Sequence, residues 1–242
     1  MTIHMHVGDF FSFADNSDET PTECQFIINE IILDKLESKK IQVLDLGCGA
    51  GEKIHYISSF ISYCCGVDIC TDLIDLSIYD EIIIGDVLNS ELPIVFQPDL
   101  IIASHILPYI RRNAYSTFLQ NIQSWLSPKG YAVIFEMTGE GPLGSIKSEI
   151  LGKKLITSSD KFDLWLEEFH IPHETCHLNA QIMVSSSEQM YEVVKFFCEK
   201  IHTEFESKKV RVRNQINHLK KDGHYELNYH IKAYVFKNFS KN

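Results

Sequence analysis

The chain has 242 residues, of which 45% are hydrophobic and 23% charged, the balance of one enzyme-sized globular domain with a large buried core. Its net charge of −11 disfavours a nucleic-acid partner, because such binding depends on Lys and Arg side chains that neutralise phosphates. Seven scattered cysteines, no signal-peptide pattern and no apolar run near the ~20 residues of a membrane span predict a cytoplasmic protein with reduced thiols and no membrane partner.

The N-terminal part predicts one helix behind a polar segment. Residues 1–18 are polar and carry an aromatic cluster at 10–13, which fits either a lid over a ligand or core contacts of the first helix. The helix is expected from Thr20, a good N-cap residue, to about residue 36. Glu23 completes a capping box in this interpretation.

The next segments alternate between strand and helix. Strands are expected at 41–46, 63–68, 81–85, 100–104 and 131–136, with helices at about 52–61, 71–78 and 112–126. The strands are continuous Ile, Val and Leu runs, which is typical of a parallel sheet covered on both faces.

The second half is less regular. Helices are expected at about 143–155, 160–169, 187–202 and 203–221, and strands within 174–185 and 225–237. The last strand has a period of two, which suits an antiparallel position late in the sheet. We therefore predict an α/β fold with a doubly wound, Rossmann-like, seven-stranded sheet. It is mostly parallel with an antiparallel last strand, and it has helices on both faces and extra helical elements after strand 5.

The strongest functional signal is the loop after the first strand, Asp45-Leu-Gly-Cys-Gly-Ala-Gly51, with glycines at Gly47, Gly49 and Gly51. Glycine lets the backbone approach a ligand closely because no Cβ intervenes. The second strand ends at Asp68, and an acid about 20 residues after the loop can accept two hydrogen bonds from a ribose diol. The pattern predicts a nucleoside pocket.

The residue after the loop discriminates between cofactors. Dinucleotides favour G-x-G-x-x-G with the pyrophosphate at a helix N-terminus, but Glu52 would compete there with a second anion. S-adenosyl-L-methionine has no phosphate and carries a sulfonium cation. The string from Asp45 to Gly51 resembles motif I of the class I S-adenosylmethionine-dependent methyltransferases. This resemblance covers about residues 20–136 and implies that cofactor and methyl transfer.

Two further segments extend the resemblance. Ile82-Ile-Ile-Gly-Asp-Val87 is similar to the family's third strand, which implies an adenine contact at its end. The segment 99–109 resembles motif IV, whose strand end lies beside the methyl-donating sulfur. The cofactor-binding residues implied in addition to the loop are Asp68, Ile69, Asp86, Val87 and Ser104, with His105 as the catalytic candidate.

Within the superfamily, the chain resembles the histamine N-methyltransferase-like group. The matching segments are 17–19, 105–109, 164–178 and 227–229. The resemblance implies that Glu19 binds an acceptor ammonium and that His105 and Asn228 contact the group being methylated. Tyr109 is a further substrate-binding candidate, because aromatic side chains can line cation pockets. His105 stands where the group has Gln, and Asn228 is a single Asn rather than a pair, so the acceptor stays open.

We predict methyl transfer to a small molecule, at an amine or imidazole nitrogen, by in-line SN2 attack. A hydroxyl or carboxylate acceptor with His105 as its base is an alternative. A cofactor-binding partner without catalysis is another. Monomer and homodimer both stay open.

The expected layout is one methyltransferase domain over 1–242. It comprises an N-terminal lid and helix at 1–38, a cofactor-binding core at 39–136, and substrate-covering helices with the last strands at 137–242.

Two clusters are interpreted as structural. A metal is not expected at the first, because a strand would split its side chains between two faces, and the second fits a solvated helix face. They are His170, His173, Cys176 and His177, and Lys208, Lys209, Arg211, Arg213, Lys220 and Lys221.

Overall fold

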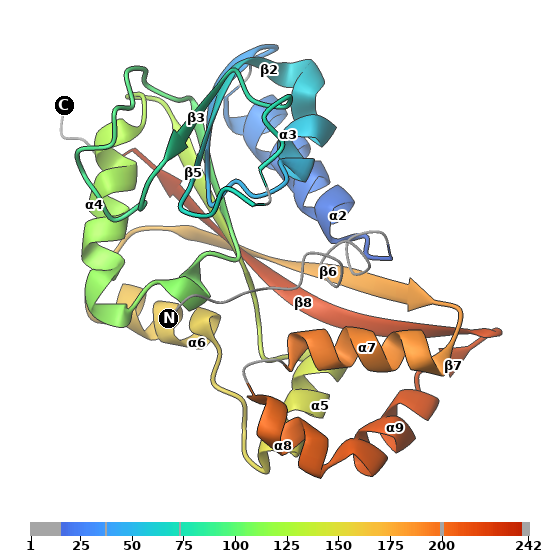
Figure 1. The fold of residues 1–242 in the computed structure, drawn as a ribbon. Helices are drawn as coiled ribbons and strands as arrows, with labels where there is room; N and C mark the ends of the chain where they lie inside the picture. The colour runs from blue at the N-terminus through green and yellow to red at the C-terminus, as the bar shows by residue number, and fades with distance from the viewer. Residues whose placement is uncertain (1–15, 37, 73, 199–200, 239–242) are drawn as a thin grey trace. The chain divides into compact units, whose positions relative to one another are not determined.

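The structure, a computed structural model, describes residues 16–36, 38–72, 74–198 and 201–238 (Figure 1). The chain divides into two compact units: unit 1 comprises 1–19, 137–157 and 179–231, and unit 2 comprises 20–136, 158–178 and 232–242. The aromatic cluster at 10–13 and the predicted lid lie outside the described residues. A single domain over 1–242 stays a prediction.

Unit 2 is built on the five predicted parallel strands, which are confirmed. They are β1 (Ile41–Leu46), β2 (Ile61–Asp68), β3 (Glu81–Ile84), β4 (Leu100–Ser104) and β5 (Tyr131–Met137). Their order is β3-β2-β1-β4-β5, so the chain reverses direction across the sheet between β1 and β4. In open α/β sheets, ligands bind at the carboxyl ends of the strands beside such a reversal.

The sheet continues through β8 (His224–Lys237) and β6 (Glu174–Val184), and β7 (Lys220–Lys221) pairs with β8. The Asn238 N–H donates to the Gly130 carbonyl and the Thr138 N–H donates to the His230 carbonyl, so β8 runs antiparallel to β5. The predicted α/β fold with an antiparallel last strand is confirmed. The two-residue β7 is an additional strand that the sequence analysis did not predict.

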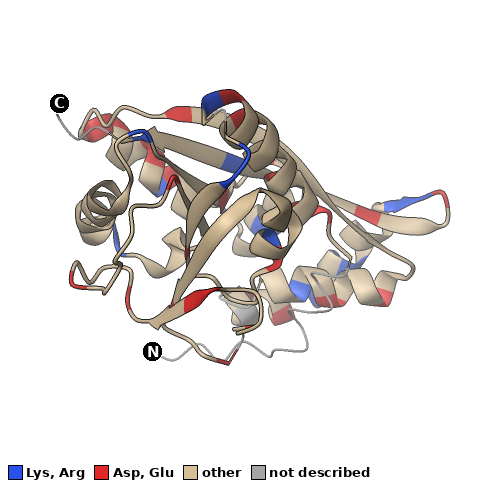
Figure 2. Ribbon diagram, turned by 90° about the horizontal axis from the view of Figure 1, so that it is seen from above, with Lys and Arg blue, Asp and Glu red and all other residues tan. Residues whose placement is uncertain are grey.

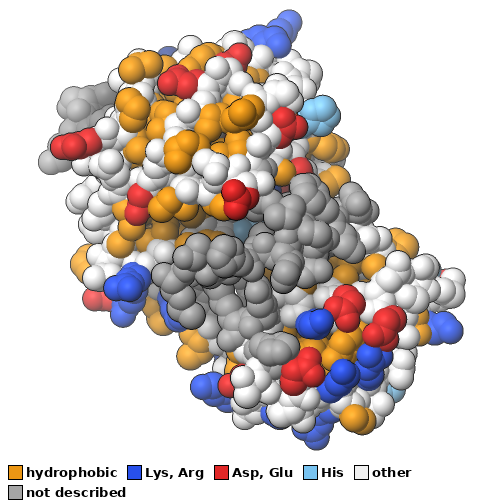
Figure 3. Space-filling view, in the orientation of Figure 1, with side chains coloured by type: hydrophobic (Ala, Val, Ile, Leu, Met, Phe, Trp, Pro, Cys, Tyr) orange, Lys and Arg blue, Asp and Glu red, His pale blue; other side chains and the backbone are white. Residues whose placement is uncertain are grey.

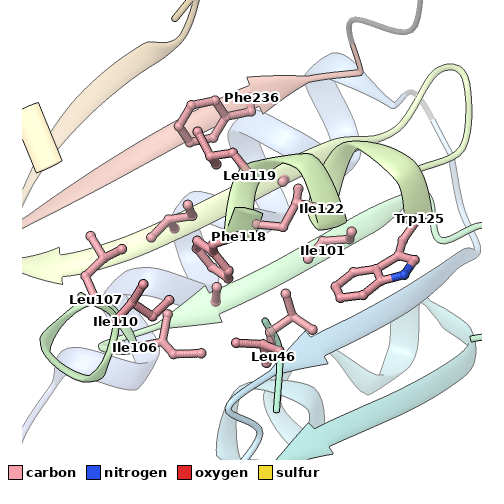
Figure 4. Packing of buried hydrophobic residues seen from close by; sticks show 14 of the residues in the cluster. Leu46, Ile101, Ile106, Leu107, Ile110, Phe118, Leu119, Ile122, Trp125 and Phe236 are labelled. Carbon is pink, nitrogen blue, oxygen red and sulfur yellow. The ribbon is translucent and has the colours of Figure 1, made fainter. Parts of the chain in front are cut away.

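Helices cover both faces of the unit 2 sheet. They are α2 (Glu19–Phe26), which continues as a π-helix (Ile27–Lys35), α3 (Glu52–Ile57), α4 (Tyr115–Trp125) and α6 (Ser158–Glu168). Short 3₁₀ turns lie at Ser58–Phe60, Leu107–Tyr109 and Arg112–Ala114. Phe26 of α2 packs edge-on against Phe135, while α4 packs Phe118 and Ile122 on the other face, near Ile101 (Figure 4). Ile134, next to Phe135, belongs to the α4 side, as strand alternation requires.

The helix expected at about 71–78 is wrong: the described residues of this stretch form turns. The Asp75 carboxylate accepts hydrogen bonds from the N–H and the hydroxyl of Ser77. Such Asx turns give the backbone an alternative to helix.

Unit 1 contains the helices α5 (Gly141–Leu151), α7 (Ser187–Phe197), α8 (His202–Ser207) and α9 (Lys209–Asn217). Ser186 and Gln189 form a capping box at the start of α7. The helix expected at 187–202 ends at Phe197, and the one expected at 203–221 is two helices followed by β7. Among the described residues, none of these or the unit 2 helices has the length and apolar character that a membrane crossing requires.

The basic cluster of unit 1 is matched by acidic neighbours. Arg213 makes two hydrogen bonds to Glu188, at 2.7 and 2.9 Å, and Arg211 pairs with Glu149 at 3.0 Å. The Lys208 ammonium donates to backbone carbonyls at the end of α5. Acidic and basic positions are interspersed in Figure 2, and both signs stand side by side at the lower right of Figure 3. These contacts favour a solvated, internally neutralised helix face.

We expect Gly66→Ala to destabilise unit 2, because a Cβ there would lie 2.8 Å from the Cys48 Sγ and 3.1 Å from the Tyr79 ring. Overpacking of this kind costs ~1–3 kcal/mol and lowers the urea midpoint of unfolding. The same substitution in a Tyr79→Ala background should cost less, because the ring is gone. An unchanged midpoint for Gly66→Ala would contradict the close approach.

Candidate active site

The loop between β1 and α3 exposes its backbone at the carboxyl ends of the strands. Gly47, Gly49 and Gly51 have φ of +72°, +45° and +73°, which only glycine adopts readily. The Gly47 N–H donates to the Val67 carbonyl at 2.7 Å, which fixes the loop to the end of β2. A Cβ built on Gly49 would meet no atom of the described residues within 4 Å, so these residues leave space for a ligand directly over Gly49.

Asp68 ends β2 beside this loop. Its Oδ2 accepts the N–H of Gly49 at 3.0 Å, and its Oδ1 accepts the N–H of Cys70 at 2.8 Å. Each carboxylate oxygen has further lone-pair capacity, so this arrangement suits acceptance from a ribose diol. Ile69, the next residue, is 72% exposed and leaves an apolar side chain at the same edge.

Asp86 and Val87 follow β3, where the resemblance implies an adenine contact. The Asp86 Oδ1 accepts the N–H of Leu88 at 2.9 Å, so this exposed carboxylate forms an Asx turn. Val87 is buried, and its carbonyl accepts a hydrogen bond from Asn121 of α4. Both residues thus have local structural partners.

Asp45 is buried behind the loop and depends on a tyrosine that the sequence analysis missed. The Tyr79 hydroxyl donates to the Asp45 Oδ2 at 2.8 Å and lies 3.3 Å from the Cys48 carbonyl. Burial raises the pKa of Asp45 to about 6, while the Tyr79 hydrogen bond and the Lys53 charge oppose this rise. Tyr79 directly follows the stretch expected to be helical, and no sequence signal pointed to its contact with Asp45.

A buried carboxylate lies at the end of β4. Glu23 of α2 has no exposed surface. Its Oε2 accepts the Ser104 hydroxyl at 2.9 Å and pairs with the Lys53 ammonium at 3.0 Å. Its Oε1 lies 3.4 Å from the His105 Nε2. The predicted pair Ser104 and His105 thus shares a partner, Glu23, which is itself paired with Lys53. The sequence analysis placed neither Glu23 nor Lys53 in the site.

The predicted capping role of Glu23 is wrong. α2 begins at Glu19, whose N–H donates to the Ser17 hydroxyl at 3.1 Å, and the Thr20 hydroxyl donates to Glu52 instead of capping the helix. Glu23 is four residues before Ile27 and shares its buried helix face. The sequence did contain a signal for the pairing of Glu23. This residue aligns with apolar positions of the helix, and a charge on a buried face must be paired.

His105 adopts a strained backbone at the end of β4. Its φ is +53°, a left-handed conformation that costs a non-glycine residue about 1 kcal/mol or more. Its N–H donates to the Phe135 carbonyl at 2.9 Å, and the next residues, Ile106 and Leu107, are anchored in the apolar core (Figure 4). The surroundings therefore hold the imidazole in place. Tyr109, in the following 3₁₀ turn, is 59% exposed.

In unit 1, Glu19 meets Tyr229 rather than Asn228. The Tyr229 hydroxyl donates to the Glu19 Oε2 at 2.8 Å, so the Ser17 hydroxyl, also at 2.8 Å, donates to the tyrosine oxygen. Asn228 is exposed between the buried Leu227 and Tyr229, so its side chain lies on the opposite face of β8. The period of two in this strand was the signal that could have selected Tyr229.

A family model described as "Methyltransferase domain" matches residues 19–179, well over half of the chain. The chain belongs to the methyltransferase domain family. The matched segment contains the glycine loop, Asp68 and the Glu23–His105 pair, and it agrees with the prediction of an S-adenosylmethionine-dependent methyltransferase. No curated protein sequence matches this methyltransferase.

Solved structures support the fold of this methyltransferase. A Bacillus halodurans C-125 protein assigned as a methyltransferase superposes with a TM-score of 0.52 at 12% identity, covering 83% of this chain and 94% of its own. A cyclopropane-fatty-acyl-phospholipid synthase-like protein from Lactobacillus casei ATCC 334 gives 0.52 at 12%, covering 90% and 91%. An Anaeromyxobacter dehalogenans protein assigned as a type II methyltransferase gives 0.53 at 9%, covering 83% and 90%. At these identities the likeness establishes the fold alone.

The residues at the loop fit S-adenosylmethionine as the cofactor of this methyltransferase. The open space over Gly49 and the carboxylate of Asp68 suit a nucleoside. Glu52 at the start of α3, which accepts the Thr20 hydroxyl, keeps an anion where a dinucleotide would place its pyrophosphate. A cofactor with a cationic sulfonium and no phosphate agrees with this charge.

We expect Asp68→Ala to weaken S-adenosylhomocysteine binding about 100-fold, since hydrogen bonds to a charged group contribute ~1.5–3 kcal/mol each. Isothermal titration calorimetry measures this. Asp72→Ala removes an exposed carboxylate four residues away and serves as the control. Equal affinity in the Asp68→Ala variant would remove Asp68 from the ribose site.

S-adenosylmethionine affinity should fall as the pH drops through about 6. The raised pKa keeps Asp45 charged above about 6 and neutral below it, and a cationic ligand favours the carboxylate form. The affinity should then decline by up to tenfold per pH unit below about 6, and Asp45→Asn should remove this decline. Calorimetry from about pH 8 to about pH 5 checks it. Parallel profiles for both proteins would contradict it.

Proposed function

We propose that this methyltransferase transfers the methyl group to a small molecule at an amine or imidazole nitrogen, as in the histamine N-methyltransferase-like group. The observation that carries the proposal is the pairing of buried Glu23 with His105 at the carboxyl end of β4. Ligands of such sheets bind at this edge. A carboxylate and an imidazole at one strand end can attract a cation and remove its proton.

The chemistry needs few protein groups. S-adenosylmethionine supplies a methyl carbon made electrophilic by its sulfonium, and the carbon–sulfur electron pair leaves with the sulfur as the new bond forms. An alkylammonium has no lone pair, so it must lose a proton before its nitrogen attacks. An imidazole ring has an ordinary pKa of about 6.5 and can accept that proton near neutral pH. The nearby Glu23 carboxylate would stabilise the imidazolium that results.

Charge supports a cationic acceptor. Glu19 is 93% buried, and its carboxylate is oriented by the Tyr229 hydroxyl. A carboxylate held in this way suits a charge-assisted hydrogen bond to an ammonium. The net charge of −11 acts in the same direction. We therefore assign acceptor binding to Glu19 and Tyr229, with Asn228 and Tyr109 as further candidates.

An O-methyltransferase is the second candidate. The Glu23–His105 pair could equally deprotonate a phenol or another hydroxyl group, whose anion would then attack. The two functions differ in the charge of the acceptor that they favour. A neutral or anionic acceptor gains nothing from Glu19.

A small-molecule acceptor is proposed in preference to a nucleic acid. In the described part of unit 1, the basic residues Arg211, Arg213 and Lys221 are engaged by Glu149, Glu188 and Glu226. Phosphates would have to displace these carboxylates. Location in the cytoplasm and a monomer or homodimer remain our proposals.

A methyl-transfer assay with tyramine tests the acceptor atom directly, because tyramine carries an amine and a phenol in one molecule. It would be run beside imidazoles, simple amines, phenols and carboxylates, and NMR of the products would locate the methyl group. We expect N-methylation of an amine or imidazole. Methyl ethers alone would favour the O-methyltransferase, and no small-molecule product would overturn both.

Glu19→Gln should raise the KM for an amine acceptor about tenfold or more, because the ammonium loses a charged partner, while S-adenosylhomocysteine affinity stays unchanged. Tyr229→Phe should raise it less, since the carboxylate remains but is no longer oriented. Glu30→Gln, an exposed acid later in the same helical segment, is the matched control. An unaltered KM in Glu19→Gln would remove Glu19 from the acceptor site.

A further inference from the structure

We propose that Glu23 is a positioning residue that fixes the tautomer of His105. In this arrangement the imidazole donates its Nε2–H to the Glu23 carboxylate, so Nδ1 is the atom that takes up the acceptor's proton. The inference rests on the proposed function for the role of Nδ1. The tautomer itself can be tested without activity.

The two oxygens of Glu23 have different partners. The Ser104 hydroxyl and the Lys53 ammonium both lie on Oε2, at 2.9 and 3.0 Å. Oε1 is buried and has no hydrogen-bond partner among the described residues, while the His105 Nε2 lies 3.4 Å from it. A buried carboxylate oxygen needs a donor. The His105 Nε2 lies just beyond the usual N–H···O length, so a small movement of the ring would bring its N–H onto this oxygen.

The backbone that carries the imidazole is held in place. The left-handed backbone at His105 is held by the hydrogen bond from its N–H to the Phe135 carbonyl. Ile106 and Leu107 bury the following residues in the core. The ring is 27% exposed while Glu23 is fully buried, so the ring is the part of the pair that a ligand can reach.

Several charges bear on the pair. Lys53 of α3 neutralises Glu23 from the Oε2 side, and Asp45 of β1 is electrostatically coupled to both Lys53 and Glu23. Glu19 lies one turn earlier on α2, and Glu136, also buried, is the next-to-last residue of β5. Among these groups, Lys53 carries a positive charge and the others are acids. The surroundings therefore favour the imidazolium once the proton has been taken up.

The proton moves in a balanced sequence. Nδ1 takes a proton from the acceptor ammonium, whose nitrogen keeps the electron pair and attacks the methyl carbon. The imidazolium then has N–H bonds at both nitrogens, and Nε2–H still points at Glu23. Release of the Nδ1 proton to water restores the neutral Nε2–H tautomer.

Substituting the carboxylate by an amide gives a sharp test. In Glu23→Gln, the amide oxygen should take the Oε2 place, because two donors already converge there. The NH₂ group then faces Nε2, which becomes an acceptor, and His105 changes to the Nδ1–H tautomer. ¹⁵N NMR of histidine-labelled protein reports the tautomer, and the spectrum of His105→Gln identifies the signal among the 11 histidines.

Kinetics supply the second readout. Glu23→Gln should lower kcat about tenfold or more and shift the acid limb of the kcat pH profile down by about one unit, with cofactor affinity retained. Combined with His105→Gln, it should lower kcat no further, because both act through one group. Asp163→Asn is the matched control, since that carboxylate also accepts a lysine and a hydroxyl, from Lys232 and Tyr234, each within 2.9 Å.

The outcomes are separable. An Nε2–H tautomer in the native protein that inverts in Glu23→Gln supports the proposal, whereas an Nδ1–H tautomer in the native protein overturns it. An unchanged spectrum and pH profile in Glu23→Gln also overturns it. If His105→Gln keeps full kcat, the proposed base fails, while the tautomer result still decides what Glu23 does.

Discussion

The carboxylate of Glu23, fully buried in unit 2, is the constraint on which the rest of the site depends. A charge in the interior is stable only when it is paired and hydrogen-bonded. Two elements meet that requirement together: α3 contributes Lys53, and the end of β4 contributes Ser104 and His105. The helices α2 and α3 and the end of β4 are therefore held together by the Glu23 side chain.

A second buried acid organises the cofactor edge. Asp45 and Gly66 are paired across β1 and β2, and the Tyr79 ring lies against Gly66 while its hydroxyl reaches Asp45. A side chain at position 66 would collide with the Tyr79 ring. The hydrogen bond between Tyr79 and Asp45 therefore depends on the absence of a Cβ at Gly66. This arrangement keeps a carboxyl group with a pKa raised to about 6 behind the loop.

Three acids of the chain, Asp68, Glu23 and Glu19, differ in the groups that they bind. Asp68 accepts the N–H of Gly49 in the glycine loop with one oxygen and the N–H of Cys70 after β2 with the other, which fits a neutral ribose contact. Glu23 shares its charge with a lysine and an imidazole, which fits proton transfer at the methyl acceptor. In unit 1, the Glu19 carboxylate accepts a hydrogen bond from the hydroxyl of Tyr229, a neutral donor. Acids with different partners thus suit different chemical tasks on one chain.

The sequence by itself determined the strands, the glycine loop, the acid after β2 and hence the family and cofactor, because each follows from local patterns of burial, turn chemistry and spacing. It misplaced the helix at 71–78, where Asp75 and Ser77 favour a turn, and it interpreted Glu23 as a cap. Only the tertiary structure decided that Glu23 faces His105, that Tyr79 reaches Asp45 and that Tyr229 rather than Asn228 meets Glu19. These contacts join residues far apart in the chain, and they are set by packing, which no local pattern encodes.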